Sequence, residues 1–417
     1  MANYSAGSPF FDVRMRGFPA RTDVDEAVAL IRKRVSSLGP ESVPVDGAAG
    51  RVLAKAVTAE VPVPHFDRAA FDGFALRAAD TAGAARDHPV PLRVVGEALP
   101  ARPFGRAIGV GEAVRIMTGS PIPVGADAVL PAEHARESNG ELTIAEPVGQ
   151  WKNVGRVGED VSLGRTVLPA RRVLRPQDLG LLSSIGIAQV DVVRRPRVAI
   201  LITGDEILPP GSKPTGFKIV DSNSVILRAL IGRDGGEALP TNHLADRPDA
   251  IRAAMTADDR DVLLMSGGTS VGREDHTPRL VAELGELPIH GLALRPASPA
   301  GIGFIRNRPV FLLPGNPVAC LCAYDLFAGR AVRLLGGRSD ELPYRTVERP
   351  VAGRIESPVG RVEYARVTVG PDGVRPVPVT GASVLSSTVA ADGFVLVPKE
   401  RHGYAPGEVV TVHLYDD

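Results

Sequence analysis

Residues 261–278 read DVLLMSGGTSVGREDHTP, and this stretch decides the fold of the domain that contains it. The apolar run Val262 to Met265 has the length and side chains of a buried strand. Glycines and small polar residues follow, and from Pro278 apolar residues return at helical spacing. Glycine lets a backbone approach an anion closely, and the N–H groups at a helix start can bind that anion. The stretch therefore predicts a strand, a loop and a helix, and the loop alone fits either phosphate binding or a plain tight turn.

The composition sets the class of protein. The chain has 417 residues, so two to four domains are expected. Hydrophobic residues at 44% and charged residues at 23% are globular values, and the net charge of zero gives no support to a nucleic-acid partner. The first residues lack a signal-peptide layout, and no apolar run approaches a membrane span, so a cytoplasmic protein without a membrane partner is expected. The two cysteines, Cys320 and Cys322, are expected to be buried core residues.

Strands and helices alternate from Arg197 to about residue 335. Strands are predicted at 198–202, 237–244, 262–265 and 309–313, with helices at about 225–231, 248–256, from 278 and from 318. This alternation predicts a parallel, doubly wound sheet. An earlier helix is predicted at about 24–37, and a short one starts at Pro176. Residues 62–147 predict a mostly β module, and beyond about Gly337 only strands are expected.

Polar loops follow the predicted parallel strands. Ligands of doubly wound sheets bind outside the carboxyl ends of the strands, so these loops predict one shared site. Each acid alone is best explained as a helix cap, but four acids beside two Gly- and Pro-rich loops favour Mg²⁺ and phosphate binding. The predicted loop residues are Thr203, Gly204, Asp205 and Glu206; Asp246; Ser266, Gly267, Gly268, Ser270 and Asp275; and Pro314, Gly315, Asn316 and Pro317.

The ordered motifs resemble one family, the molybdopterin molybdotransferases, which comprise the MoeA proteins and the gephyrin E domain. The strings that carry the resemblance are FDRAAFDGFAL, IMTGSPIPVGADAVLPAE, VGEDV, TGDEI, SGGTSVGREDHT and LLPGNP. They occur in the family's order from about residue 20 to 331, so the resemblance covers nearly the whole chain. Each string alone is unspecific, whereas the ordered combination is highly specific.

The resemblance implies a multidomain α/β and β protein with four domains. They are a split elongated N-terminal domain (1–61 and 148–192), an inserted β module (62–147), a doubly wound molybdopterin-binding domain (193–335) and a C-terminal β barrel-like domain (336–417). It also implies a homodimer with its active site between subunits. The implied reaction inserts molybdenum from molybdate into adenylylated molybdopterin and releases AMP, with Mg²⁺ as cofactor. The implied further partners are the molybdopterin adenylyltransferase and molybdoenzyme acceptors.

The resemblance also assigns roles to residues. Glu206, Asp246 and Asp275 match acidic site residues and would hold the cation, and Asp67 joins them as a catalytic candidate. The phosphate would lie on Ser266, Gly267, Gly268 and Ser270, and Pro314 to Pro317 would shape the pocket. Further substrate contacts are implied for Thr118, Asp160, Arg295, Ser298, Arg366 and Ser387. Asp67, Thr118 and Asp160 would reach the cleft from the neighbouring subunit.

Two departures from the family concern positive charge. The family usually reads K-x-x-x-K-P-G-K-P where this chain has residues 291–299, GLALRPASP, so Gly291 and Ser298 replace lysines and Arg295 alone keeps a charge. Molybdate is a dianion, so the loss of two cations should weaken its capture unless other groups compensate. The family's FDNSAMDG reads FDRAAFDG, and we hypothesise that Arg68 supplies some of the missing charge. Arg68→Ala should then raise the molybdate concentration that gives half-maximal activity, and an unchanged concentration would remove the idea.

Three alternatives remain open at the level of sequence. The loop at 266–278 is also similar to that of the molybdopterin adenylyltransferases, although that family lacks the β module, the split domain and the C-terminal domain. A non-catalytic molybdopterin-binding scaffold is the second alternative, against which the intact acids argue. The third is a preference for tungstate, which has nearly the same size and charge as molybdate.

Overall fold

The computed structural model describes residue 18 and residues 20–270, 272, 275–378 and 381–415. The chain divides into two compact units. The large unit comprises Met1–Glu41, Gly50–Ala54 and Asp191–Asp417, and the small unit comprises Ser42–Ala49 and Lys55–Val190. Within the described ranges, no helix is long and apolar enough to cross a membrane.

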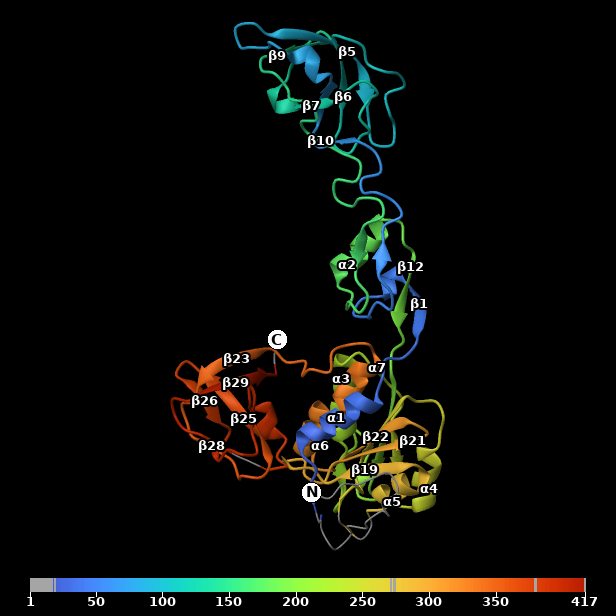
Figure 1. The fold of residues 1–417 in the computed structure, drawn as a ribbon, viewed down its shortest axis with the longest axis vertical. Coiled ribbons are helices and arrows are strands. Elements are labelled where there is room, and N and C mark those ends of the chain that lie inside the picture. Colours follow the sequence, from blue (N-terminus) through green and yellow to red (C-terminus); the bar gives the residue numbers. More distant parts are fainter. Residues whose placement is uncertain (1–17, 19, 271, 273–274, 379–380, 416–417) are drawn as a thin grey trace. The chain divides into compact units, whose positions relative to one another are not determined.

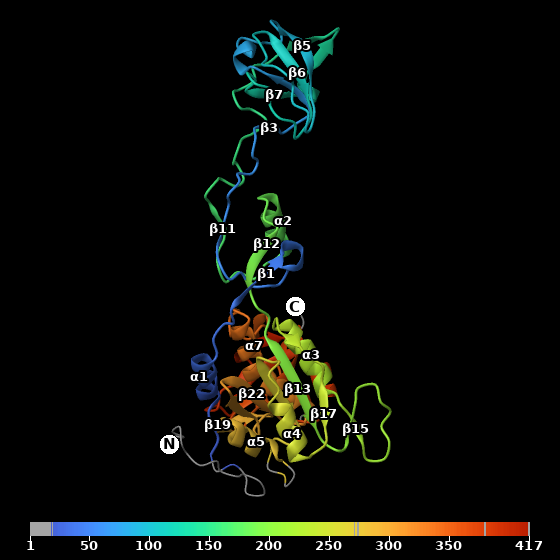
Figure 2. The same cartoon turned by 90° about the vertical axis from the view of Figure 1, so that its right-hand side faces the viewer.

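A seven-stranded sheet forms the centre of the large unit (Figure 2). Its strand order is β16-β13-β18-β22-β21-β19, with β17 also paired to β13. The strands are β13 (Arg197–Thr203), β16 (Glu237–Ala238), β17 (Asn242–Leu244), β18 (Val262–Ser266), β19 (Glu286–His290), β21 (Gly301–Ile305) and β22 (Arg308–Leu313). Part of the sheet is parallel. Strand β13 pairs parallel with β16, β17 and β18, and β18 in turn pairs parallel with β22.

Helices cover both faces of this sheet, as predicted. In β13, Val198, Ile200 and Ile202 pack into one core, whereas Ala199 and Leu201 pack into the other. The alternation follows from the two-residue repeat of a strand. The first core is closed by α1, α3, α6, η4 and α7, and the second by α4 and α5. The helices are α1 (Val24–Arg34), α3 (Asn223–Arg233), α4 (Pro248–Met255), α5 (Thr277–Leu284), α6 (Pro317–Ala323) and α7 (Gly329–Leu335), and η4 (Tyr324–Ala328) is a π-helix (Figure 1).

The sheet is mixed rather than wholly parallel, which corrects the prediction. Strands β22, β21 and β19 pair antiparallel at one edge. The connection between β21 and β22 is only Arg306 and Asn307, whose φ angles are +51° and +64°. Two residues with positive φ form the tight turn of an antiparallel hairpin, and parallel strands need a far longer connection. The predicted strand at 237–244 is likewise divided into β16 and β17.

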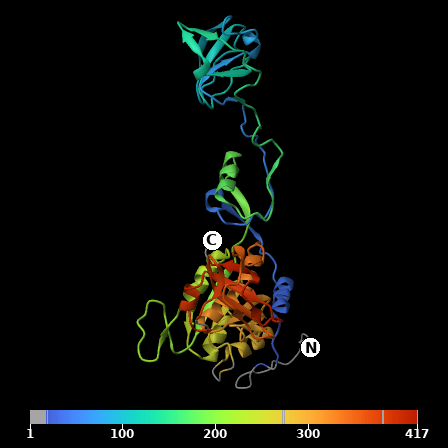
Figure 3. The same ribbon diagram turned by 90° about the vertical axis from the view of Figure 1, so that its left-hand side faces the viewer.

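The C-terminal strands form a second sheet in the large unit (Figure 3). Its order is β20-β25-β27-β29-β23, with β26 paired to β25, and β24 pairs separately with β28. The elements are β20 (Leu294–Arg295), β23 (Thr346–Pro350), β24 (Ile355–Glu356), β25 (Val362–Gly370), β26 (Gly373–Pro376), α8 (Ser386–Val389), β27 (Gly393–Val397), β28 (Gly403–Tyr404) and β29 (Val409–Leu414). The prediction that no helix follows Gly337 was wrong, because α8 forms one helical turn there. With four residues, α8 is too short to give a periodic signal in the sequence.

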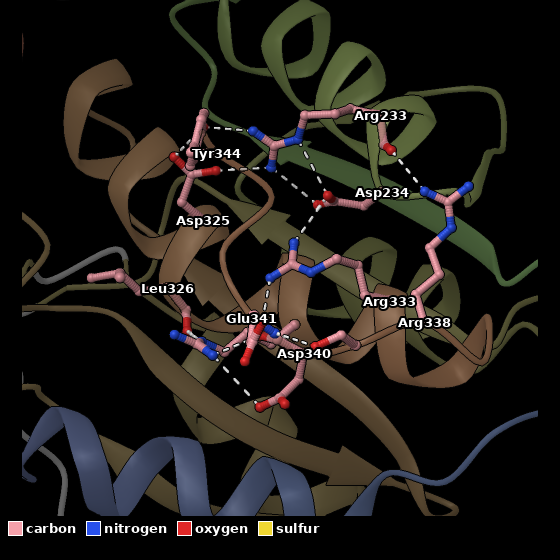
Figure 4. Close-up of polar contacts among 11 residues, drawn as sticks. Arg233, Asp234, Asp325, Leu326, Arg333, Arg338, Asp340, Glu341 and Tyr344 are labelled. Carbon is pink, nitrogen blue, oxygen red and sulfur yellow. Dashed lines mark hydrogen bonds and ion pairs between the residues drawn. The ribbon is translucent and has the colours of Figure 1, made fainter. Parts of the chain in front are cut away.

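A buried polar network joins Tyr364 of this C-terminal sheet to the helices, and Figure 4 shows the part of the network around Arg233, Asp234, Asp325 and Tyr344. Asp325 of η4 accepts hydrogen bonds from Arg233 (2.9 Å), Tyr344 (2.8 Å) and Tyr364 of β25 (3.3 Å). Arg333 of α7 pairs with Asp234 at 2.9 Å. Burial raises the pKa of Asp325, and the Arg233 charge opposes that shift. The π-turn therefore places one carboxylate where three donors from different elements converge.

The small unit contains the β module and a short helical segment. The module's sheet has the order β7-β4-β6-β5-β9-β8. The elements are η1 (Val45–Gly47), β2 (Val57–Thr58), β3 (Arg68–Ala69), β4 (Gly73–Leu76), η2 (Ala78–Thr81), β5 (Val90–Ala98), β6 (Glu112–Ile116), β7 (Ala128–Pro131), η3 (Ala132–His134), β8 (Arg136–Ser138), β9 (Glu141–Ile144), β10 (Val154–Gly155), β11 (Thr166–Leu168) and α2 (Pro176–Ser184). Strands β1 (Pro40–Pro44) and β12 (Gln189–Val193) pair where the chain passes between the units.

Candidate functional site

The register of the parallel strands brings the predicted loops to one edge of the sheet. In the strand register, Thr203 pairs with Leu244, and Ser266 pairs with both Ile202 and Leu313. The loops that follow these positions therefore start side by side. They are the loops of TGDE, Asp246, SGGTS and PGNP, as the sequence predicted.

Asn223 joins two of these loops. Its Nδ2 donates to Oγ of Ser266 at 2.8 Å and to the carbonyl oxygen of Gly315 at 2.8 Å. Oγ1 of Thr269 donates to the carbonyl oxygen of Leu313, the last residue of β22, at 3.1 Å, which ties the SGGTS loop to the neighbouring strand. Asn223 is the first residue of α3 and is buried, so the helix fixes the relative position of both loops.

The SGGTS loop forms a close backbone cradle around Gly267 and Gly268. A Cβ atom on Gly267 would lie 2.2 Å from the carbonyl oxygen of Thr203, and its φ of +95° disfavours any other residue. Oγ1 of Thr203 and Oγ1 of Thr277 lie 3.0 and 3.3 Å from the position of a Cβ on Gly268. Both hydroxyls are buried and neither has a hydrogen-bond partner among the described residues. Buried hydroxyls normally find partners, so this pair is the candidate for polar contacts at the site.

Acidic side chains border the cradle. The backbone N–H of Asp246 donates to Oδ1 of Asp205 at 3.3 Å. Partial burial raises the pKa of Asp246, the Asp205 and Glu206 charges raise it further, and the nearby His276 opposes them. Oδ2 of Asp275 accepts from the backbone N–H of Gly272 at 2.6 Å. Among the described residues, no three His, Cys, Asp or Glu side chains lie close enough together to form a metal site by themselves.

Arg366 and Ser387 lie together near the start of α6. The Arg366 guanidinium donates to Oγ of Ser387 and, at 3.4 Å, to the carbonyl oxygen of Gly381. The next residue, Ala382, accepts a hydrogen bond from the backbone N–H of Val318 at 3.0 Å. Val318 follows the PGNP loop directly, so the C-terminal sheet brings this Arg–Ser pair to the border of that loop.

Arg295 and Ser298 lie on the chain that leads into β21. Arg295 forms an ion pair with Glu363 of β25 at 3.4 Å, because β20 and β25 pair in register there. Oγ of Ser298 donates to the carbonyl oxygen of Leu292 at 3.1 Å. Ser298 also accepts a hydrogen bond from Nε of Arg21 at 2.9 Å.

The remaining predicted residues, Asp67, Thr118 and Asp160, belong to the small unit. Oδ1 of Asp67 accepts from the backbone N–H of Val157 at 2.8 Å and from Nε of Arg156 at 3.3 Å. The backbone N–H and the hydroxyl of Thr118 both donate to Oδ1 of Asp72, at 2.7 and 2.9 Å, and lower its pKa. The pairing of β3 with β10 holds the chain next to Asp67 against the chain that precedes Asp160.

Two further site residues, Asn223 and Thr277, carry only weak signals in the sequence. Asn223 stands in the run DSNS, which predicts no more than a helix cap, and Thr277 stands in the motif DHTP before the helix. Both roles depend on contacts with residues far away in the chain, which no local pattern reveals.

Comparisons with known proteins cover the whole architecture. The MoeA N-terminal region (domain I and II) matches residues 22–186, a molybdopterin binding domain matches residues 199–333, and the MoeA C-terminal region (domain IV) matches residues 348–415. A molybdopterin biosynthesis protein of Methanocaldococcus jannaschii is 34% identical over 385 residues, covering 90% of this chain and 92% of that protein. The chain belongs to the MoeA family.

Other MoeA-family proteins extend the comparison. A molybdopterin molybdenumtransferase of Staphylococcus aureus is 30% identical over 398 residues, covering 94% of this chain and 95% of that protein. The crystal structure of a MoeA protein from Pyrococcus horikoshii is 32% identical, with a TM-score of 0.82 over 95% of this chain and 100% of that one. The family resemblance seen in the motifs and the multidomain MoeA architecture are therefore confirmed.

Proposed function

We propose that this MoeA-family chain is a molybdopterin molybdenumtransferase. It takes adenylylated molybdopterin and molybdate as substrates, transfers molybdenum to the pterin and releases AMP. The observation that carries the proposal is the cradle at Gly267 and Gly268, with its two buried unpartnered hydroxyls and its acidic border in the described part of the chain. The names of relatives that match nearly the full chain support the same activity.

The cradle supplies the contacts that a phosphate group requires. Backbone N–H groups of a glycine-rich loop and the hydroxyls of Thr203, Thr277 and Ser270 can donate to phosphate oxygens. The position of the SGGTS loop is fixed beforehand, because Asn223 binds it to the PGNP loop and Thr269 binds it to the end of β22. Binding therefore costs little reorganisation, and the phosphoanhydride is held in one orientation. Pro314 and Pro317 shape the neighbouring wall.

The acidic border fits a bound Mg²⁺. Mg²⁺ prefers oxygen ligands, and it is commonly held by one or two carboxylates with substrate phosphates and waters completing its shell. A full three-carboxylate cluster is therefore not required. One or two carboxylates at a time from the set Glu206, Asp246 and Asp275 would hold the ion, and its charge would offset the burial and the carboxylate repulsion that raise the pKa of Asp246. When bound, the cation supplies charge withdrawal from the phosphoanhydride that releases AMP.

The oxyanion end of the site lies with Arg295, Ser298, Arg366 and Ser387 in the proposal. A guanidinium fork suits a tetrahedral dianion, and the Ser387 hydroxyl fixes the orientation of the Arg366 fork. In the homodimer, Asp67, Thr118 and Asp160 would approach from the neighbouring subunit. The contacts of Asp67 with Arg156 and of Thr118 with Asp72 support this role, because they hold these side chains in place without ligand.

The finer architecture is part of the same proposal. The domain limits are 1–61 with 148–192, 62–147, 193–335 and 336–417, and the last domain is barrel-like. We further propose a cytoplasmic homodimer that receives adenylylated molybdopterin from the adenylyltransferase and delivers its product to molybdoenzyme acceptors. The broad division is supported by the separate family models for residues 22–186, 199–333 and 348–415.

The direct test is product analysis. Purified protein is mixed with adenylylated molybdopterin, Mg²⁺ and molybdate, and the pterin product is analysed for molybdenum by mass spectrometry. The proposal expects a molybdenum-containing pterin without addition of ATP. Adenylylation of free molybdopterin at the cost of ATP would instead indicate the adenylyltransferase, and a pterin that is bound but never changed would indicate a scaffold.

A further inference from the structure

Asp221 is a buried carboxylate that stands two residues before α3 and bonds to a strand as well as to that helix. Its side chain is only 1% exposed. Oδ1 of Asp221 accepts a hydrogen bond from the backbone N–H of Ser224 at 3.0 Å, and Oδ2 accepts from the Ser224 hydroxyl. Oδ2 also accepts from Nε2 of His243 at 2.8 Å, because an ionised carboxylate has no proton to donate. The bonds from Ser224 satisfy the start of α3, whereas the bond from His243 joins that start to β17.

The backbone beside Asp221 holds the TGDE loop. Strand β14 (Ile207–Leu208), which follows Glu206 directly, pairs parallel with β15 (Ile219–Val220), which precedes Asp221 directly. The N–H of Ile219 donates to the carbonyl oxygen of Glu206 at 3.0 Å, and the N–H of Asp221 donates to the last residue of β14 at 2.9 Å. The backbone on both sides of Glu206 is thus fixed relative to Asp221.

His243 connects the same carboxylate to the second acidic loop. It is the middle residue of β17 and pairs with Ile202 of β13. Asp246 follows shortly after the end of this strand, and its N–H donates to Oδ1 of Asp205 at 3.3 Å. A side chain that anchors β17 therefore limits how far the Asp246 loop can move relative to the TGDE loop.

The first turn of α3 carries the connection to the glycine cradle. Asn223 lies between Asp221 and Ser224 in the sequence, and its amide donates to Ser266 and to Gly315 at 2.8 Å each. Asp221 holds this turn in place, so one carboxylate acts on the acidic loops and on the SGGTS and PGNP loops together. His243, by contrast, acts on the acidic side through β17.

We propose that the Asp221–His243 pair sets the position of the acidic loops relative to the glycine cradle. A divalent cation shared by a carboxylate and a phosphate needs both oxygens at about 2.0–2.1 Å, so a small shift of one loop weakens its binding. His243 is then a positioning residue, because it acts through the Asp246 loop and not on the substrate. The inference rests on the proposed function for the identity of the cation site.

Two substitutions of His243 separate its N–H donor from its bulk. His243→Leu removes the donor, whereas His243→Gln offers an amide N–H to Asp221 in place of Nε2. The first readout is Mn²⁺ binding in the presence of adenylylated molybdopterin, followed by electron paramagnetic resonance, because Mn²⁺ accepts the same oxygen ligands as Mg²⁺. The second is the Mg²⁺ concentration that gives half-maximal AMP release. His243→Leu should raise both values about tenfold, the usual effect of losing an outer partner of a metal site, and His243→Gln should stay within about threefold of the wild type.

Pterin binding distinguishes positioning from a general loss of structure. Without metal, the affinity for adenylylated molybdopterin should stay within about twofold of the wild type in both His243 variants, because the cradle is untouched. Asp221→Asn should weaken the binding of metal and pterin alike, since a single carbonyl oxygen cannot serve both Ser224 and His243. The matched control is His88→Leu, which breaks an exposed pair with Asp87 at 3.3 Å in the β module and should change neither value.

Each outcome decides the proposal. Metal binding that weakens in His243→Leu and is kept in His243→Gln supports it. Wild-type Mn²⁺ binding in His243→Leu, equal weakening in both His243 variants, or a parallel loss of pterin affinity would overturn it, as would absence of Mn²⁺ binding to the wild type. The thermal midpoint identifies a variant that fails to fold, and His243→Ala is then measured in place of His243→Leu. If the wild type releases no AMP with molybdate or tungstate, the proposed function fails, and Mn²⁺ binding still decides the role of the pair.

Discussion

Gly267 and Gly315 stand in neighbouring loops at the sheet edge, but the room around their Cα atoms differs. A Cβ on Gly267 would meet the Thr203 carbonyl oxygen at 2.2 Å, whereas the nearest atom to a Cβ on Gly315 lies at 3.9 Å. Gly267→Ala should therefore displace the cradle at a cost of about 1–3 kcal/mol and lower the affinity for adenylylated molybdopterin at least tenfold. Gly315→Ala is the matched control and should bind within about threefold of the wild type.

Calorimetric titration with the adenylylated pterin gives both affinities, and equal weakening in the two variants would contradict a cradle at Gly267.

At this scale the loops could be predicted from the sequence, because glycine and acidic residues directly after short apolar runs are typical of the carboxyl ends of parallel strands. The contact of Arg21 with Ser298 could not be predicted, since it joins residues 277 positions apart. Nor could the sequence show that Phe18 fills the space at Gly291.

At the scale of elements, the parallel part of the sheet follows from alternating apolar runs, and the antiparallel edge does not. The strand Gly301–Ile305 contains two glycines in a short apolar run, and its turn at Arg306 and Asn307 lacks the usual glycine signal. The π-helix could not be predicted either. It shifts the helical register after Ala323, so a sequence with helical periodicity gives no sign of where Asp325 will point.

The Asp325 network should stabilise the large unit. Asp325→Asn keeps the shape of the side chain but removes the negative charge that pairs with Arg233 in the buried network. Breaking a buried ion pair typically costs about 3–5 kcal/mol of unfolding free energy, so urea unfolding should shift to clearly lower concentration. Asp372→Asn, which breaks an exposed pair with Arg375, is the control and should unfold like the wild type. A wild-type midpoint for Asp325→Asn would exclude this role.

Glu112 of β6 should make the β module sensitive to acid. Hydrogen bonds from Arg106, from the backbone N–H of Gly109 and from Arg93 lower the pKa of Glu112 to about 2. A carboxyl whose pKa falls on folding adds stability above its unfolded pKa, and this stability is lost as the pH falls from 4.5 towards 2. Glu112→Gln should therefore lower the thermal midpoint at pH 7, and the difference should shrink below pH 4.5. A pH-independent difference in calorimetric scans would contradict the ionic origin.

At the scale of the whole molecule, the family and its multidomain architecture were predicted from the order of motifs, because six strings in one order leave little room for chance. The assembly was predicted only through the resemblance, and it has a direct test. If each active site combines Asp275 of one subunit with Asp67 of the other, a heterodimer of Asp67→Ala and Asp275→Ala contains one intact site. Refolding the two inactive variants together should then restore about a quarter of wild-type activity. A mixture as inactive as its components would contradict a shared site.

The central claim is that the acids and the glycine cradle serve one transferase site. The measurement that tests it most directly is AMP release from adenylylated molybdopterin with Mg²⁺, with and without molybdate, for the wild type and for Asp275→Ala. We predict that the wild type releases AMP only when molybdate is present and that the variant binds the pterin but releases none. A wild type that binds the pterin and releases no AMP with either molybdate or tungstate would contradict the account.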